Sequence, residues 1–318
     1  MIKEQVLYER FIETLRRKVS SKSSLVNLLT DVLMIEKDAV YRRLRGEVSF
    51  TFAEIASISE QLGISLDILI GITTATHRPS HLKVNKHGSP TDADYKTISD
   101  LNDKIRGYKG NPDAEVALAG NLLPQVFYLN FDFITRYYLF LWELTLNENG
   151  MNYSEVVIPE RTKTIQKSLI SNMRSLTANL VLDFLTFQYL VTDLKYFASI
   201  HRIEAEDVLE IKNDLFGALD YIEKICNDGK FAEGGTANVF VSDVNLSTNY
   251  MYIKCEDFFF SMIKGFVLDG SVSYDQMAFK QTHTCIAAIK QISTLISGSG
   301  GRSRILFFDK QRKIIESL

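Results

Sequence analysis

The sequence predicts a mainly α protein in which a small all-helical N-terminal domain precedes a larger helical α+β domain. Apolar residues recur three and four positions apart through most of the first 228 residues, which is the spacing of amphipathic helices. Apolar and polar residues alternate clearly, as in strands, only after Asn238, in NVFVSDVNL and NYMYIKC. A chain of 318 residues has room for two or three domains. We expect a first domain over residues 1–72, a polar linker over 73–90 and a second domain over 91–318.

The composition is that of an ordinary soluble protein, with 46% hydrophobic and 24% charged residues. The formal net charge is −3, which excludes a protein that coats nucleic acid in bulk. Residues 1–71 hold ten basic and ten acidic side chains, so this segment is neutral in sum. Its basic residues gather at Arg16–Lys22 and Arg42–Arg45, and any contact with DNA must come from such local patches.

Cysteine use and hydropathy indicate a cytoplasmic protein without a membrane span. The three cysteines are far apart and form no CxxC pair, which favours reduced thiols. The N-terminus has no apolar signal-peptide core. Charged Asp132, Arg136 and Glu143 interrupt the most apolar stretch, residues 126–146, so we expect a buried helix there.

Three helices are predicted in the first 46 residues. The first covers about residues 4–18, and the second begins after Ser23 or Ser24, either of which can cap it. A tight turn at residues 34–36 leads to a third helix over about 37–45. Val40 and Leu44 stand one turn apart on that helix and should face inward, and Gly46 should end it.

Two further helices complete the first domain. The fourth opens with a capping box, because Thr51 and Glu54 stand three apart in TFAE, and it ends at Gly63. A fifth is expected over residues 66–70, capped by Ser65. Five short helices in about 70 residues fit a compact all-α domain.

The tight pairing of the second and third helices predicts a helix-turn-helix that binds double-stranded DNA. A recognition helix presents polar side chains at its start and on its outer face, where they enter the major groove. Lys37, Asp38, Tyr41 and Arg42 should occupy this face, and Arg or Lys can read guanine edges. The remaining candidates should contact phosphate: Ser23, Ser24, Arg43 and Arg45. The alternative is a small helical bundle whose basic face is merely solvated.

Residues 25–71 resemble the XRE-type, phage-repressor-like helix-turn-helix family, so the resemblance implies a five-helix, lambda-repressor-like domain. The matching pieces are Leu29-Thr30, Leu33-Met34-Ile35-Glu36, Ala39-Val40-Tyr41-Arg42, Gly46 and Ile64-Ser65-Leu66-Asp67. The chain departs from the pattern at three positions. The family has a small alanine where this chain has Thr30, a turn glycine at Met34 and an apolar residue at Arg43. Met34 must therefore place a residue with a Cβ in a strained turn. The chain as a whole also resembles an uncharacterised group of Bacteroidetes-type regulators.

The second domain is predicted to be helical with strands near its end. Helices are expected over residues 91–108, 125–147, 160–176, 179–200, 205–228 and 276–297. A short strand is expected over 114–119, strands follow Asn238, and GSGGRSRILFF predicts a turn, a short strand and a final helix. Because operator half-sites mirror a two-fold protein, we expect this domain to form a homodimer.

No enzyme is expected, because GxSxG, HExxH and P-loop motifs are absent. His77, His81 and His87 have spacings that fit no standard zinc pattern, so neither a metal nor a cofactor is predicted. Residues 298–301, with their neighbouring arginines, are either an anion-binding loop or a flexible turn. Two functions remain open: a dimeric DNA-binding regulator that senses a small molecule or peptide, and an interaction protein that uses the helix-turn-helix only for packing.

Overall fold

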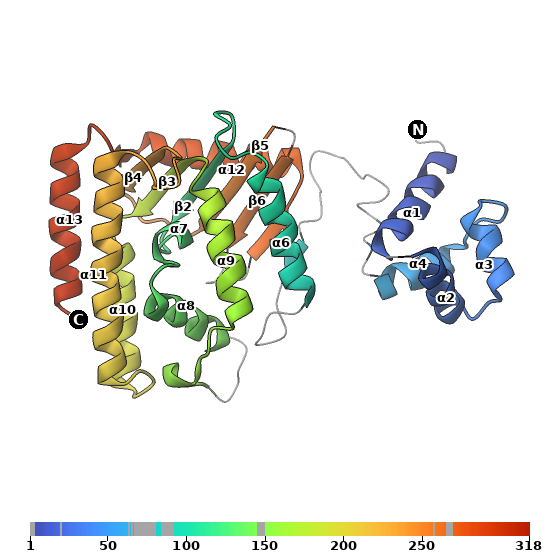
Figure 1. Ribbon diagram of the computed structural model, residues 1–318, viewed down its shortest axis with the longest axis horizontal. Coiled ribbons are helices and arrows are strands. Elements are labelled where there is room, and N and C mark those ends of the chain that lie inside the picture. The colour runs from blue at the N-terminus through green and yellow to red at the C-terminus, as the bar shows by residue number, and fades with distance from the viewer. Residues whose placement is uncertain are drawn as a thin grey trace. The chain divides into compact units, whose positions relative to one another are not determined.

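The computed structural model divides the chain into two compact units, residues 1–80 and 81–318 (Figure 1). It describes residues 4–19, 21–62, 64, 66, 81–83, 92–144, 150–256, 258–264 and 270–318. No helix among these residues is both long enough and apolar enough to cross a membrane.

The N-terminal unit is helical, as predicted. Its helices are α1 (Glu4–Lys18), α2 (Lys22–Leu33), α3 (Lys37–Leu44) and α4 (Phe52–Leu62). They enclose one apolar core built around the fully buried Leu15, Leu29, Val40 and Ile58. The helix predicted over 66–70 lies outside the described residues, apart from Leu66.

The C-terminal unit is built on a mixed sheet of eight described strands. They are β1 (His81–Lys83), β2 (Glu115–Gly120), β3 (Thr177–Asp183), β4 (Ala237–Ser242), β5 (Asn249–Cys255), β6 (Phe258–Lys264), β7 (Gly270–Ser273) and β8 (Ser293–Leu295). Their order is β1-β7-β6-β5-β2-β3-β4-β8. Strands β2, β3 and β4 run parallel, whereas every other neighbouring pair is antiparallel.

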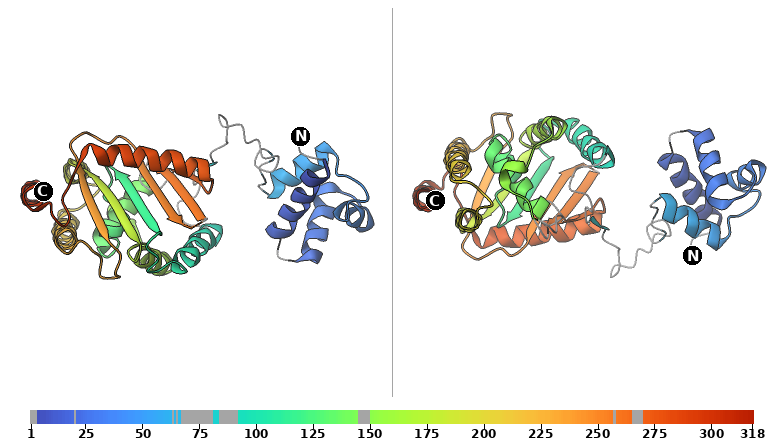
Figure 2. Two further views of the ribbon diagram at one scale, coloured as in Figure 1. Left: turned by 90° about the horizontal axis from the view of Figure 1, so that it is seen from above. Right: turned by 90° about the horizontal axis from the view of Figure 1, so that it is seen from below.

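Helices cover the two faces of this sheet unequally. Parallel neighbours are joined by right-handed crossovers, so the connections β2→β3 and β3→β4 fall on the same face. These connections contain α7 (Gln125–Tyr128), α8 (Asp132–Leu144), the 3₁₀ turn η1 (Tyr153–Glu155), α9 (Glu160–Met173), α10 (Thr186–Ser199) and α11 (Ala205–Asp228). Helix α6 (Asp92–Arg106) packs against α9 on that face, while α12 (Gln276–Gln291) lies on the opposite face (Figure 2). A smaller core fixes α12, through Phe279 and Ile286.

The strands are not confined to the end of the chain, which corrects the predicted fold. The helix predicted over 179–200 is in fact β3 followed by α10. Strand β3 reads TANLVLD and is buried along nearly its whole length, because parallel neighbours flank it and helices cover both faces. A strand buried on both faces shows no alternation, so periodicity cannot separate it from a helix.

The aromatic helix predicted over 125–147 is interrupted. Residues 129–131 separate the short α7 from α8, and residues 145–149 lie outside the described part. Asp214 in α11 accepts hydrogen bonds from the backbone N–H groups of Phe133 and Ile134, at 2.8 and 3.3 Å. The first turn of α8 is therefore capped by a carboxylate that lies 81 residues beyond Phe133 in the sequence.

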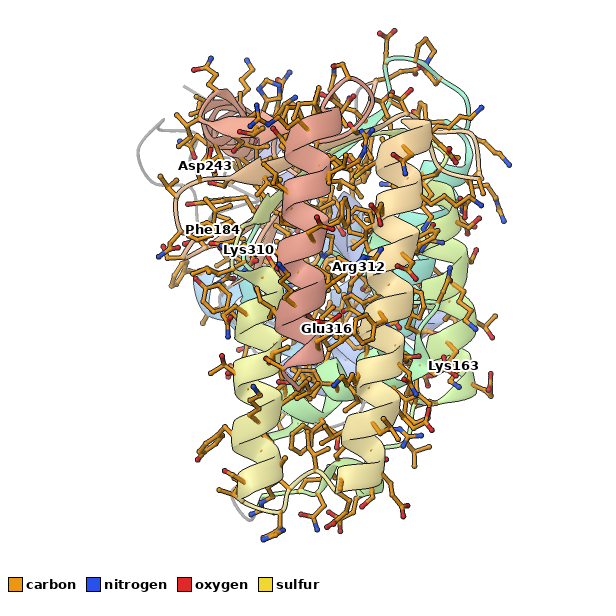
Figure 3. All side chains as sticks on the ribbon, turned by 90° about the vertical axis from the view of Figure 1, so that its left-hand side faces the viewer. Lys163, Phe184, Asp243, Lys310, Arg312 and Glu316 are labelled. Carbon is orange, nitrogen blue, oxygen red and sulfur yellow. The ribbon has the colours of Figure 1, made fainter. Side chains whose placement is uncertain are left out.

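The C-terminal end also differs in detail from the prediction. Helix α12 ends at Gln291, and β8 precedes the glycine-rich turn, so the strand predicted after that turn is wrong. The final helix α13 (Gly301–Glu316) packs against α10 and α11 (Figure 3). Its Arg312 pairs with Asp220 and Glu223 of α11 at 2.6 and 2.5 Å.

The linker predicted over 73–90 contains a strand. Residues 81–83 form β1, which pairs antiparallel with β7 at the edge of the sheet. The rest of the predicted linker, with His77 and His87, lies outside the described residues.

Candidate nucleic-acid interface

The helix pair α2–α3 begins with a polar cap. Ser21, not Ser23 or Ser24, is the N-cap residue, and its Oγ accepts a hydrogen bond from the Ser24 N–H at 3.1 Å. Ser23 and Ser24 instead lie exposed in the first turn of α2. A helix N-terminus with exposed serines suits an anionic ligand, because backbone N–H groups and hydroxyls are both donors.

The turn between the two helices contains the strain that the sequence predicts. Met34 has φ 53° and ψ 41°, in the left-handed region where glycine is favoured. Its side chain is 91% exposed, so it contributes no packing in return. The turn between α2 and α3 is thus made by a methionine at the position where the XRE-type pattern has glycine.

Helix α3 has one side that packs and another that faces outward. Val40 and Leu44 are buried in the core of the N-terminal unit, as predicted. Lys37, Asp38 and Arg42 are exposed. Tyr41, next to Arg42 in the sequence, is half-buried. The outer face therefore presents two cations, a carboxylate and a phenol from one rigid element.

Arg43 does not project outward with the other predicted contacts. Its guanidinium pairs with the Glu54 carboxylate at 2.9 Å, and both side chains are largely buried, at 16% and 17% exposure. It also donates to the Ala39 carbonyl at 3.3 Å and lies 6.0 Å from the centre of the Phe50 ring. Arg43 therefore joins α3 to α4, while its contact with phosphate stays a prediction.

The carboxylate of Glu54 serves two purposes. It accepts the Thr51 backbone N–H at 2.8 Å, while the Thr51 hydroxyl accepts the Glu54 N–H at 3.2 Å, which confirms the predicted capping box. Burial raises the pKa of Glu54, but the bonds from Thr51 and Arg43 outweigh this effect and lower it overall. The cap and the ion pair therefore share one anion.

The exposed arginines at the end of α3 share another anion. Arg45 bonds Glu47 through two nitrogens at 2.6 and 3.1 Å, and Arg42 lies 3.8 Å from the same carboxylate. A hydrogen bond from Arg45 lowers the pKa of Glu47. All three side chains are about half exposed, with values of 59%, 58% and 48% for Arg42, Arg45 and Glu47. Glu47 is not among the residues predicted from the sequence, although it stands only two residues from Arg45.

The Arg43–Glu54 pair gives a testable separation of folding from binding. Arg43→Ala is expected to destabilise the N-terminal unit by about 2 kcal/mol, because it leaves a largely buried carboxylate without its partner. Hydrogen exchange of amides in α2 and α4 measures the change. Arg45→Ala is the matched control, since it removes the same charge from an exposed position. Equal protection in both variants would contradict the structural role of Arg43.

Polar side chains elsewhere in the C-terminal unit contact other parts of the chain. His283 lies on α12 and is exposed, and its ring is 5.4 Å from that of Tyr252 and 5.7 Å from that of Phe279, centre to centre. In the glycine-rich turn, Arg304 donates to the carbonyls of Ile296 and Gly298 at 2.9 and 3.1 Å. Carbonyl oxygens around a guanidinium do not form an anion cradle. Within the described ranges no cluster of His, Cys, Asp and Glu could hold a metal ion.

Residues 3–93 match the family described as the BetR domain, a helix-turn-helix-like domain associated with Bacteroidetes. The matched segment includes the whole α1–α4 bundle and runs to the beginning of α6. No curated protein and no solved structure matches the chain. The family match suggests a DNA-binding regulatory role for the N-terminal unit.

Proposed function

We propose that this chain is a sequence-specific DNA-binding transcription regulator rather than an enzyme, that it acts as a homodimer, and that its C-terminal unit receives an effector. The observation that carries the proposal is the outer face of α3. Lys37, Asp38 and Arg42 are exposed there, while Val40 and Leu44 fix the opposite side of the helix. Side chains on a rigid helix can enter the major groove together and read adjacent base edges.

The ion pairs at the end of α3 are compatible with this role. Arg42 and Arg45 are held by Glu47 in exposed positions, and such pairs contribute little to stability. DNA phosphates or guanine edges can therefore replace Glu47 at low cost. In the free protein Glu47 also neutralises part of the positive charge of Arg42 and Arg45. Its ion pairs hold both guanidinium groups in place.

Arg42→Ala is expected to weaken binding to the specific operator by about 1–3 kcal/mol and to relax the preference at one base position. A groove-facing arginine typically makes two hydrogen bonds to guanine, and alanine makes none. An operator selected from random DNA, followed by binding assays on its single-base variants, provides the measurement. Arg10→Ala, at an exposed position of α1, is the control with the same change in charge. An equal loss on every sequence would show that Arg42 contacts phosphate only.

Salt dependence tests the dimer and its phosphate contacts together. If about three phosphates per subunit are neutralised in a dimer, the slope of log affinity against log salt should be roughly −5. Light scattering on the full chain should give the mass of two subunits. A monomer in solution, or a slope half as steep, would contradict the two-fold arrangement.

A second function is favoured by one observation. Residues 1–71 carry ten basic and ten acidic residues, and Arg43 and Arg45 are already paired within the unit. A helix-turn-helix used only to bind protein would show this equal number of basic and acidic residues. It would also show a salt slope near zero and no operator in the selection experiment.

A further inference from the structure

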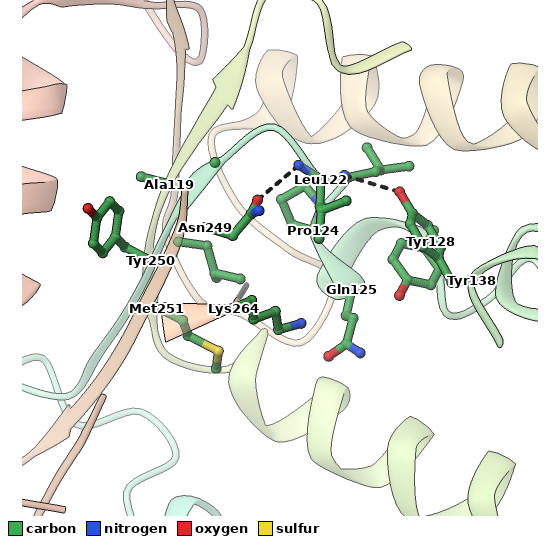
Figure 4. Close-up of a pocket in the computed structure, with 13 residues that line it drawn as sticks. Ala119, Leu122, Pro124, Gln125, Tyr128, Tyr138, Asn249, Tyr250, Met251 and Lys264 are labelled. Carbon is green, nitrogen blue, oxygen red and sulfur yellow. Dashed lines mark hydrogen bonds between the residues drawn. The ribbon is translucent and has the colours of Figure 1, made fainter. Parts of the chain in front are cut away.

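A pocket opens in the C-terminal unit at the carboxyl end of strand β2. The end of β2, the start of β5, the end of β6 and the segment leading into α7 line it (Figure 4). In open α/β sheets, ligands bind outside the carboxyl ends of the parallel strands. The pocket lies at such an end, where parallel β2 meets antiparallel β5.

The wall of the pocket is held by hydrogen bonds from distant residues. Asn249 in β5 accepts the Leu122 N–H at 3.0 Å and donates to the Asn121 side chain at 2.9 Å. The Tyr138 hydroxyl accepts the Leu123 N–H at 3.2 Å, and its ring stacks on Tyr128 with centres 4.5 Å apart. The segment after β2 is therefore fixed before any ligand arrives, which favours binding because little ordering is needed.

Among the described residues of the lining, Lys264 is the one with a charged side chain. It stands directly opposite Asn249 in the β5–β6 pairing, is half-buried, and makes no hydrogen bond or ion pair within the described part of the chain. The other titratable groups of the lining are Tyr128, Tyr138 and Tyr250, whose pKa values burial raises, so they stay neutral near pH 7. Burial lowers the pKa of Lys264 to about 8. Near pH 7 the amine is still mostly protonated, and no described residue of the lining neutralises its charge.

The rest of the lining selects the ligand. Leu118, Pro124 and Met251 are apolar and suit a hydrocarbon or ring. Gln125 adds an amide, and Figure 4 shows the Lys264 side chain extending toward it. One ammonium and one amide donor, with apolar walls, match a carboxylate attached to an apolar body. A phosphate, with more charge and no apolar part, would leave most of this wall unused.

We propose that this pocket binds a small monocarboxylate with an apolar body, its carboxylate on Lys264 and Gln125. The inference rests on the proposed function only in treating this ligand as the effector of a regulator. Binding itself is measured without DNA, so a failure here and a failure of DNA binding are separate results.

Isothermal titration of the full chain with benzoate tests the site. Benzoate should bind with a Kd of about 1 mM or below. Its neutral isostere benzamide should bind at least about 10-fold more weakly, because it loses the charge-assisted bond to Lys264. Lys264→Met should weaken benzoate binding to the level of benzamide. Lys254→Met, in the neighbouring strand β5, should leave it unchanged.

Other outcomes would overturn the proposal. The first is equal affinity for benzoate and benzamide. The second is benzoate binding by Lys264→Met that is as tight as that of the original chain. The third is the absence of any heat of binding with benzoate well above about 1 mM. Gln125→Leu gives a second variant outside the sheet. This variant should weaken the binding of benzoate more than that of benzamide, because the Gln125 side chain contacts the carboxylate. An equal loss of affinity for both compounds would show that Gln125 is not part of the site.

Discussion

Replacing Gly120 by alanine is expected to destabilise the C-terminal unit by about 3 kcal/mol or more, because the added methyl group has no space. A Cβ at this position would lie 2.0 Å from Asn249 Oδ1 and 2.8 Å from Asn249 Cα. Rotating the Asn249 side chain removes the first clash but breaks its bond to the Leu122 N–H. The second clash is with backbone, so β2 and β5 must separate.

Tryptophan fluorescence during denaturation measures this effect without interference from the N-terminal unit. Trp142 is the only tryptophan in the sequence and is buried in α8. Gly107→Ala is the matched control, because a Cβ there meets only the Lys104 carbonyl, at 3.5 Å. If both variants unfold at the same denaturant concentration, the close approach of β2 and β5 is not a constraint on the fold.

The N-terminal unit was largely predictable because its signals are local. The Thr51–Glu54 box, the inward Val40 and Leu44, and the turn at Met34 each depend on residues within one or two helical turns. Spacing and capping preferences act over that range. The N-cap of α2 was misplaced by two or three residues, because the segment contains four serines, at positions 20, 21, 23 and 24.

The C-terminal unit was harder to predict because distant residues determine its elements. The boundary before α8 depends on Asp214, which belongs to α11 and lies 81 residues beyond Phe133. Strand β3 is a strand because β2 and β4 flank it, and its own sequence is equally compatible with a helix. Neither fact follows from the secondary-structure propensity of the local sequence.

The candidate sites show the same limit. Arg43 stands in the run YRRLR, where its neighbours Arg42 and Arg45 are exposed, yet it is drawn inward by Glu54 eleven residues away. Lys264 carries no motif at all. Only the pairing of β5 with β6 places it opposite Asn249 and beside the segment after β2. Both residues acquire their roles from tertiary contacts.

The second large effect concerns Lys264 and the pH dependence of stability. Lys264→Met is expected to raise the free energy of unfolding near pH 7 by about 1–3 kcal/mol, because it removes a charge that burial penalises. The pKa of Lys264 is about 8 in the folded protein, against 10.5 for a free lysine. The penalty is therefore fully present below pH 8, declines as pH rises toward 10.5, and is absent above it.

The advantage of Lys264→Met should accordingly be largest near pH 7 and small near pH 10, as followed by Trp142 fluorescence in denaturant at both values. Lys254→Met controls for the loss of a lysine from the same pair of strands. A gain of equal size at both pH values would mean that methionine simply packs better, and the charge would carry no cost. A gain that disappears at high pH identifies Lys264 as a residue that weakens its own fold. Such a cost is expected where a group is kept for binding, since the proposed carboxylate would supply the partner that the described lining lacks.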